Sequence, residues 1–320
     1  MYESLKKHCD DFHLYIFAFD DIAYQILSEL SFENVTIISL EEFEDAELLK
    51  VKPTRTIGEY CWTCTPSTII YCLKKYNLNH CVYIDADLYF YADPSVLAEE
   101  IRGKSVLITS HNYSPEYDQT DTSGKYCVQF IMFKNDPSGI KILNLWREEC
   151  LNWCLARFED GKFGDQKYLD DWPERFDCVH VLQNFGGGVA PWNISRYKID
   201  DNLEMLDVYA NKKSRLYFYH FEDVKFSDGK LRKNFFCSYH VSKSHLKLIY
   251  LRYLICLIRV NSRVCKKNKL IKKYSKENVF RTFLYAYFGL YKELYEEEYD
   301  KLSVFQLFKL CLKQWRKSLR

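Results

Sequence analysis

The sequence predicts an α/β fold built on a mostly parallel central sheet. Short apolar runs of strand length alternate with segments of helical periodicity along most of the chain. The 320 residues are 48% hydrophobic and 17% aromatic, which is ample apolar material for a buried core. The chain contains neither an internal repeat nor a low-complexity segment. These observations indicate a globular protein of layered helices and strands.

Strands are expected where β-branched and aromatic residues gather between turn signals. In chain order they are 13–19, 35–40, 81–84, 105–109, 126–133, 179–183 and 215–221. Helical patterns separate several of them. One helix is expected to begin near Thr65 and Pro66, and another runs over 137–154. In the segment 93–101, Asp93 is a plausible N-cap and Pro94 fits the first helical position.

The formal net charge of +1 hides an uneven distribution of charge. Residues 241–320 carry 19 Lys and Arg against 6 Asp and Glu, whereas the preceding 240 residues carry 26 against 38. From about residue 241 the pattern also turns helical, which predicts a main domain at 1–240 and a basic helical extension at 241–320. Such an extension fits packing on the acidic body or peripheral contact with an anionic membrane. Nucleic acid is not an expected partner, because no reader motif accompanies the charge.

The sequence also predicts a cytoplasmic location. Peripheral contact with the inner face of the membrane is compatible with this location. The first residues lack the apolar stretch of a signal peptide, and no window reaches the length of an apolar membrane span. Thirteen cysteines are scattered through apolar segments without a regular framework, which indicates reduced thiols. Cys61 and Cys64 form one CxxC, but no second pair follows at zinc-site spacing, so packing is the plainer interpretation.

Two carboxylates, Asp85 and Asp87, follow the apolar run 81–84 with one alanine between them. The carboxyl ends of strands are where open α/β sheets bind ligands. Two such acids can approach one divalent cation together, or one can bind the cation while the other holds a ribose hydroxyl. The plainer alternative is a solvated turn whose acids cap the next helix.

Several segments together resemble a known family, the A-fold glycosyltransferases that use nucleotide sugars. The likeness is strongest to the family 8-like enzymes, which include glycogenin and bacterial lipopolysaccharide hexosyltransferases. "YIDADLYF" resembles the strand-end DxD of that family, "KFGDQKYLDDW" its Asp-Gln element, and "LYFYHFEDVKF" its histidine segment. The likeness spans about residues 10–230 and is specific in its combination of motifs.

The resemblance implies a site made from distant parts of the chain. It implies Asp85, Asp87 and His220 as ligands of Mn²⁺ or Mg²⁺, Arg55 and Gln129 as donor contacts, Asp165 and Gln166 as residues beside the transferred sugar, and Lys225 as a diphosphate contact. Gln129 stands where the family has an asparagine and a glycine. The cluster "NFGGGVAPWN" is either a tight turn with a packed Trp192 or a wall of the site, where Gly187 would approach the ligand.

Two departures from the family pattern are visible. The chain begins at "MYESLKK", which is typical of the tail of a helix, so the family's opening strand is expected to be absent. The stretch after His220 carries Glu222 and Asp223 where the family has a glycine, which weakens the case for Lys225.

The implied reaction is transfer of a hexose from a nucleotide sugar, expected to be UDP-linked, to a glycan or lipid-linked acceptor in surface-polysaccharide or lipopolysaccharide assembly. Retention is expected from the resemblance; an inverting enzyme would instead use a base such as Asp165, which could also simply cap the following helix. One alternative is a catalytically impaired binding protein for glycans or nucleotide sugars on the same fold. Another is a haloacid-dehalogenase-like phosphatase, although Leu88 and Tyr89 fit its motif poorly.

Overall fold

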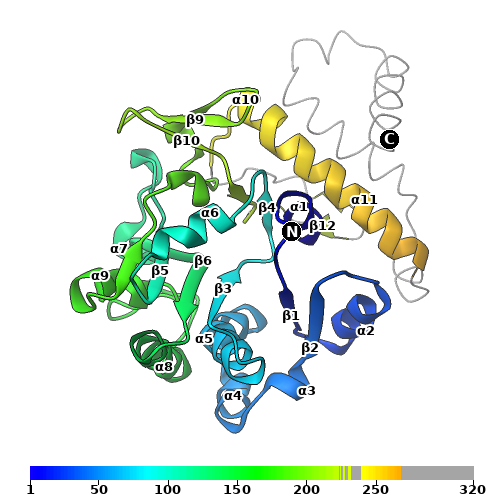
Figure 1. Cartoon of the computed structure of the whole chain (residues 1–320), viewed down its shortest axis with the longest axis vertical. Helices are drawn as coiled ribbons and strands as arrows, with labels where there is room; N and C mark the ends of the chain where they lie inside the picture. Colours follow the sequence, from blue (N-terminus) through cyan, green and yellow to red (C-terminus); the bar gives the residue numbers. More distant parts are fainter. Residues whose placement is uncertain (223, 225, 228–229, 232–238, 268–320) are drawn as a thin grey trace. The chain divides into compact units, whose positions relative to one another are not determined.

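A computed structural model describes residues 1–222, 224, 226–227, 230–231 and 239–267. The chain divides into two compact units. The first contains Met1–Lys198 and Glu204–His220, and the second contains Ile199–Leu203 and the chain from Phe221 onward. Helices and strands both build the first unit, which confirms the predicted α/β class (Figure 1). The predicted domain boundary at residue 240 stays a prediction.

Each of the seven expected strands overlaps an observed one. The strands are β1 (Leu14–Ala18), β2 (Val35–Ser39), β3 (His80–Ile84), β4 (Leu88–Phe90), β5 (Val106–Ser110), β6 (Tyr126–Lys134), β7 (Val179–Val181), β8 (Tyr197–Ile199), β9 (Glu204–Asp207), β10 (Lys212–Arg215), β11 (Phe218–His220), β12 (Phe226–Ser227) and β13 (Lys230–Leu231). The α-helices are α1 (Tyr2–His8), α2 (Asp21–Glu29), α3 (Leu40–Phe43), α4 (Ala46–Val51), α5 (Ile57–Lys75), α6 (Ser95–Ala98), α7 (Thr120–Ser123), α8 (Pro137–Asn152), α9 (Trp172–Arg175), α10 (Lys243–His245) and α11 (Leu251–Lys267).

The central sheet has four strands in the order β3-β6-β5-β7. β5 and β7 pair in parallel, and β6 runs antiparallel between β3 and β5. Three of the four strands therefore point in one direction, with β6 as the exception, and their carboxyl ends meet at one edge. β1 and β2 form a separate parallel pair, and β10, β9 and β8 form a small three-stranded sheet.

Apolar side chains cover both faces of the central sheet. On β6, Ile131 and Phe133 pack with residues of α5 and α8, which lie against each other (Figure 1). Phe130 and Met132 alternate with them and belong to the core of the opposite face. A strand that is buried on both faces reads as an unbroken apolar run, which is why the sequence predicts β6 well. Gln129 interrupts that run as a fully buried polar residue.

The first long helix, α5, begins earlier than predicted. Thr56 caps it, because its Oγ1 accepts a hydrogen bond from the N–H of Glu59 at 3.3 Å while Glu59 Oε2 accepts from the N–H of Thr56 at 2.8 Å. This reciprocal capping box satisfies two backbone donors of the first turn. Pro66 lies inside the helix instead of at its start, so the expected start near Thr65 is wrong. Cys61, in the CxxC, is a free thiol within this helix.

The second unit holds the described part of the basic extension. α11 follows a single π-helical segment at Leu246–Tyr250, and Phe221 stacks on Tyr253 with ring centroids 3.8 Å apart. In the part of the chain that the structure describes, no helix combines the length and the apolarity needed to cross a bilayer. Residues 268–320 of the predicted extension lie outside the described residues.

Candidate metal centre

The turn between β3 and β4 carries the two predicted carboxylates. Asp85 follows β3 directly, and its N–H donates to the carbonyl oxygen of Gln129 at 3.1 Å, which continues the β3–β6 ladder by one residue. The N–H of Leu88 donates to the carbonyl oxygen of Asp85 at 3.3 Å and closes the turn before β4. The backbone on both sides of Asp87 is thus held by main-chain hydrogen bonds.

Strand β11 brings the predicted histidine to these acids. β4 and β11 pair antiparallel with Leu88 opposite His220, so the histidine lies next to the turn. The N–H of His220 also donates to the carbonyl oxygen of Val189 at 2.9 Å. His220 Nε2 lies 3.1 Å from Asp87 Oδ1 and 3.7 Å from Asp85 Oδ2. One ligand atom from each of the three residues falls within 4.8 Å of the others, a spacing that one metal ion can bridge.

The three side chains perturb one another electrostatically. Burial raises the pKa of Asp85, and the charge of Asp87 adds to this increase, although His220 opposes it. Burial acts in the same direction on Asp87, but the facing imidazole outweighs it and lowers the pKa of that carboxyl. Burial alone would lower the pKa of His220, yet the two acids raise it well above the usual range. The two acids therefore favour a positive charge at the position of the ring, and a bound cation would also supply one.

The donor set fits a divalent cation. Two carboxylate oxygens and one imidazole nitrogen are ligands that Mn²⁺ accepts readily, whereas Mg²⁺ prefers oxygen alone. The side chain of His220 is 9% exposed while those of Asp85 and Asp87 are 27% and 41% exposed, so the group is open on the side of the acids. An ion held there would keep positions for ligand oxygens.

Gln129 contacts a candidate metal ligand from the protein interior and does not line an open surface. Its side chain is fully buried, and its Oε1 lies 2.9 Å from Nδ1 of His220. The amide of Gln129 is thus not exposed to a sugar donor in this structure, and contact with a donor stays a prediction.

Asp165 lies near the candidate metal ligands without joining the group of three. Its side chain is 6% exposed. Burial raises its pKa to about 7, a hydrogen bond with Thr65 partly offsets this increase, and the charge of Asp85 adds to it. The indole Nε1 of Trp146 donates to the carbonyl oxygen of Asp165 at 2.8 Å, which fixes the backbone there. Asp165 does not occupy the N-cap position of the next helical turn, which begins at Lys167.

Gln166 ties its segment to a neighbouring loop. Its Nε2 donates to the carbonyl oxygen of Ser123 at 2.8 Å. Lys167 reinforces the same connection, because its Nζ donates to the carbonyl oxygen of Thr120 at 3.1 Å and pairs with Asp170 at 3.0 Å. The Asp-Gln element is therefore anchored on the segment that contains α7.

Arg55 ties the segment just before α5 to α8. Its Nη2 donates to the carbonyl oxygen of Leu151 near the end of α8 at 3.2 Å, and its Nη1 donates to Thr54 Oγ1 at 3.1 Å. Its Nε has no partner among the described residues. Contact of Arg55 with a donor stays a prediction, as does the role of Lys225, which lies outside the described residues.

The glycine cluster packs tightly against the fold. A Cβ on Gly186 would lie 1.7 Å from the carbonyl oxygen of Arg215, and one on Gly187 would lie 2.6 Å from Leu97 Cδ1. Close approach of protein backbone and side chains therefore explains why glycine occurs at these two positions. Contact between Gly187 and a ligand stays a prediction.

Trp192 packs in the interior, which supports the tight-turn alternative. It is 5% exposed, and its Nε1 donates to the carbonyl oxygen of His111 at 2.9 Å. Its ring meets the ring of His220 edge-on, with centroids 5.4 Å apart. The indole thus limits how far the imidazole can tilt and presents no open face to a sugar.

Tyr83 is a neighbour of the acids that motif reasoning missed. Its hydroxyl donates to Asp85 Oδ1 at 2.9 Å. The sequence pattern that could have revealed this contact is the two-residue period of a strand, because residues two apart on β3 project to the same face. A tyrosine two residues before the first acid was therefore placed to reach it.

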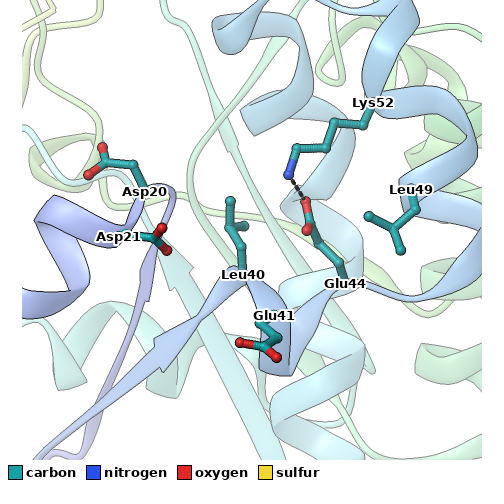
Figure 2. A pocket seen from close by; sticks show the side chains of 7 residues that line it. All are labelled: Asp20, Asp21, Leu40, Glu41, Glu44, Leu49 and Lys52. Carbon is teal, nitrogen blue, oxygen red and sulfur yellow. Dashed lines mark hydrogen bonds and ion pairs between the residues drawn. The ribbon is translucent and has the colours of Figure 1, made fainter.

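A separate cavity of about 510 Å³ lies near the carboxyl ends of β1 and β2 (Figure 2). Its lining residues are Asp20, Asp21, Leu40, Glu41, Glu44, Leu49 and Lys52. Lys52 Nζ lies 2.5 Å from Glu44 Oε1 (Figure 2). The hydroxyl of Tyr60 donates to the same oxygen at 2.7 Å. With four carboxylates and one paired lysine in its lining, the cavity is unsuited to an anionic diphosphate.

The protein is therefore an α/β protein with a candidate divalent-metal site, in which two acids at a strand end lie beside a histidine. The chain belongs to the family of the uncharacterized proteins YfnD and YfnF of Bacillus subtilis (strain 168). It is 34% identical to YfnD over 264 residues, which are 81% of this chain and 84% of YfnD. It is 34% identical to YfnF over 236 residues, 70% of this chain and 76% of YfnF. No protein-family model matches the chain.

Among solved structures, the apo form of mouse xyloside xylosyltransferase 1 is similar to this chain, with a TM-score of 0.40 and 13% identity. The match covers 68% of this chain and 88% of that one. The chemistry of the site follows from its own geometry.

Proposed function

We propose that the protein is a metal-dependent glycosyltransferase that moves a hexose from a nucleotide sugar to a glycan or lipid-linked acceptor. The observation that carries this proposal is the meeting of Asp85 and Asp87 with His220 beside the central sheet. The resemblance of the three motifs around these residues to A-fold glycosyltransferases supports it. Assembly of surface polysaccharide is the setting that we expect for such a reaction.

The chemistry of transfer explains the donor set. The leaving group is a nucleoside diphosphate, whose negative charge grows as the bond to the sugar breaks. A divalent cation supplies Lewis-acid stabilisation of that charge when it is bound. Asp85, Asp87 and His220 would hold the ion, and we expect UDP as the nucleotide and Mn²⁺ as the preferred metal. Lys225 and Arg55 remain candidates for further charge stabilisation.

The Asp-Gln element supplies the proposed contact to the transferred sugar. Burial raises the pKa of Asp165 to about 7, so near neutral pH its carboxyl can either donate a hydrogen bond to a sugar hydroxyl or accept one from it. The backbone of Asp165 and the side chain of Gln166 are both held by hydrogen bonds, which suits a positioning role. We propose retention of configuration, in which the departing phosphate oxygen takes the acceptor proton. Inversion would instead require Asp165 as the base.

Release of nucleotide from the donor tests the function. The full chain is incubated with a panel of UDP-hexoses, with Mn²⁺ or with EDTA, and UDP is quantified. We expect Mn²⁺-dependent UDP release that falls at least about 100-fold in Asp87→Asn, since a lost ligand removes transition-state stabilisation. Asp201→Asn, which alters an exposed carboxylate, is the matched control. Phosphate release from a monoester without UDP release, or no binding of any nucleotide sugar in calorimetry, would contradict the proposal.

A lipid-linked acceptor would be reached most easily from the membrane surface. Arg252, Arg259 and Arg263 are exposed on α11, and each basic residue near an anionic bilayer contributes about 1 kcal/mol. We expect the full chain to sediment with phosphatidylserine vesicles and the triple Arg→Gln variant to sediment less. Equal sedimentation of the two proteins would rule out contact through this helix.

A further inference from the structure

The imidazole of His220 has separate polar partners at its two nitrogens. Nδ1 lies 2.9 Å from Gln129 Oε1, and Nε2 lies 3.1 Å from Asp87 Oδ1. The Gln129 side chain is fully buried on β6, within an otherwise apolar run. The ring is therefore held between a buried amide on one side and the open acidic group on the other.

The side-chain amide of Gln129 lacks a hydrogen-bond partner at its nitrogen, Nε2, among the residues that the structure describes. Leaving such a donor buried without a partner is unfavourable, so an apolar side chain of similar size would stabilise the strand better. Among the described residues, the side-chain hydrogen bond that this amide gains in exchange is with the imidazole.

The backbone of the same residue reaches the other part of the metal centre. The carbonyl oxygen of Gln129 accepts a hydrogen bond from the N–H of Asp85 at 3.1 Å. One position on β6 thus contacts a ligand from the β3–β4 turn through its main chain and a ligand from β11 through its side chain.

We propose that Gln129 is a positioning residue that accepts the Nδ1 proton of His220 and so leaves Nε2 free to bind a cation beside Asp85 and Asp87. An imidazole that binds a cation keeps one proton, and the hydrogen bond at one nitrogen decides which nitrogen acts as the ligand. The inference rests on the proposed metal site and adds a residue that would touch neither metal nor substrate through its side chain.

Two neighbours of the ring need to be separated from this role. Trp192 meets the ring edge-on and offers no acceptor for its proton. The thiol of Cys127 also interacts with His220 and is another polar group near the ring. Cys127→Ala therefore accompanies the glutamine variants in the measurements.

The first measurement is the affinity of the full chain for MnCl₂ alone, by calorimetry and by electron paramagnetic resonance. Q129M removes the acceptor at nearly constant volume, and we expect it to weaken Mn²⁺ binding about 10- to 100-fold. Q129E keeps an acceptor oxygen and is expected to bind close to the wild-type value, as is Cys127→Ala. Q183M is the matched control, since Gln183 is exposed and its Nε2 donates to the carbonyl oxygen of Val181.

The second measurement reads the ring directly, without a metal. In protein labelled with nitrogen-15 histidine, the Nδ1 proton of His220 is assigned by its loss in His220→Asn. We expect this signal in the wild type and in Q129E, and its loss to solvent exchange in Q129M. If Q129M does not fold, Q129N replaces it, because its shorter amide cannot span the same distance.

The outcomes separate the two proposals. Wild-type protein that binds Mn²⁺ while Q129M binds it equally well and keeps the Nδ1 signal would overturn the role of Gln129 and leave the metal site intact. Wild-type protein that binds no Mn²⁺ but shows the expected Nδ1 signals would refute the proposed function while the hydrogen bond to Gln129 stands.

Discussion

A single buried carboxyl, that of Asp165, shows how surroundings set chemistry at the scale of a residue. Its pKa is raised to about 7, first by burial and then by the charge of Asp85, against an opposing hydrogen bond from Thr65. In the unfolded chain the same group ionises near its ordinary value of 3.8. Between these two values the folded state holds a proton that the unfolded state has released. Stability therefore falls as the pH rises from about 4 to about 7, and the loss persists above 7.

Asp165→Asn removes the buried charge and is expected to stabilise the fold at alkaline pH. We expect its free energy of unfolding to exceed that of the wild type by about 1–3 kcal/mol at pH 8 and by little at pH 4.5. Urea denaturation in EDTA at both pH values measures the difference. The exposed Asp201→Asn should not reproduce the trend, and a gain for Asp165→Asn that is equal at both pH values would contradict the assignment.

Two glycines provide a pair of substitutions with opposite expected signs. Gly186→Ala would place a Cβ 1.7 Å from a backbone oxygen, so the chain must move, and we expect a loss of roughly 2–4 kcal/mol. Gly58 lies in α5, and a Cβ added there would meet nothing within 4 Å, so Gly58→Ala should stabilise the helix by up to about 1 kcal/mol. Thermal unfolding of the two variants checks both signs.

The acids and the histidine were within reach of the sequence, whereas the contacts around them were not. Asp85 and Asp87 follow a clear strand, and His220 lies in an apolar segment that resembles a known motif, so residue types and order sufficed. The contact of Gln129 with the imidazole depends on the pairing of β6 with β3 and of β11 with β4. Strand register and partner order are tertiary properties that one sequence does not reveal.

At the scale of elements, the start of α5 is set by a capping box and not by the proline in its sequence. Glu59 accepts hydrogen bonds from the N–H of Thr56 and from the N–H of Ala156, both at 2.8 Å. It therefore caps the helix and also fastens the segment that leads to Asp165. The pattern Thr-x-x-Glu before an apolar run was readable in the sequence, but the proline drew the predicted start inward.

Glu59→Ala is expected to lower the free energy of unfolding by roughly 1–2 kcal/mol, because it removes the cap and the tie to the following segment. Glu148→Ala, an exposed glutamate within α8, is the matched control and should lie within about 0.5 kcal/mol of the wild type. Chemical denaturation measures both variants, and equal stabilities would show that the capping box contributes nothing.

The direction of β6 is another property of an element that the sequence could not supply. Its apolar residues are buried on both faces, so the run reads alike whether the strand is parallel or antiparallel to its neighbours. Strands β8 to β10 were not anticipated, because they are short and largely polar: β10, for example, reads KKSR. Short elements of this kind are stabilised by their neighbours more than by their own pattern.

At the scale of the whole molecule, the metal centre links the stability of the first unit to the metal concentration. A ligand that binds only the folded state adds about 2.7 kcal/mol when it is present at about 100 times its dissociation constant. We expect MnCl₂ to raise the unfolding temperature of the wild type by several degrees and EDTA to reverse the change.

The variants His220→Ala and Asp87→Asn test whether this stabilisation comes from the proposed site. Both should lose most of the Mn²⁺-dependent increase in unfolding temperature, because each lacks one of the three ligands. An increase of the same size in either variant would place the bound ion elsewhere on the protein.

The pairing of β4 with β11 brings His220 to Asp85 and Asp87, although the ribosome synthesises the histidine more than 100 residues after the two acids. During synthesis, the first two ligands are exposed in a nascent chain that cannot yet complete the coordination sphere. Metal capture would therefore follow the docking of β11, and loading with Mn²⁺ would report that the nascent protein has finished folding in this region.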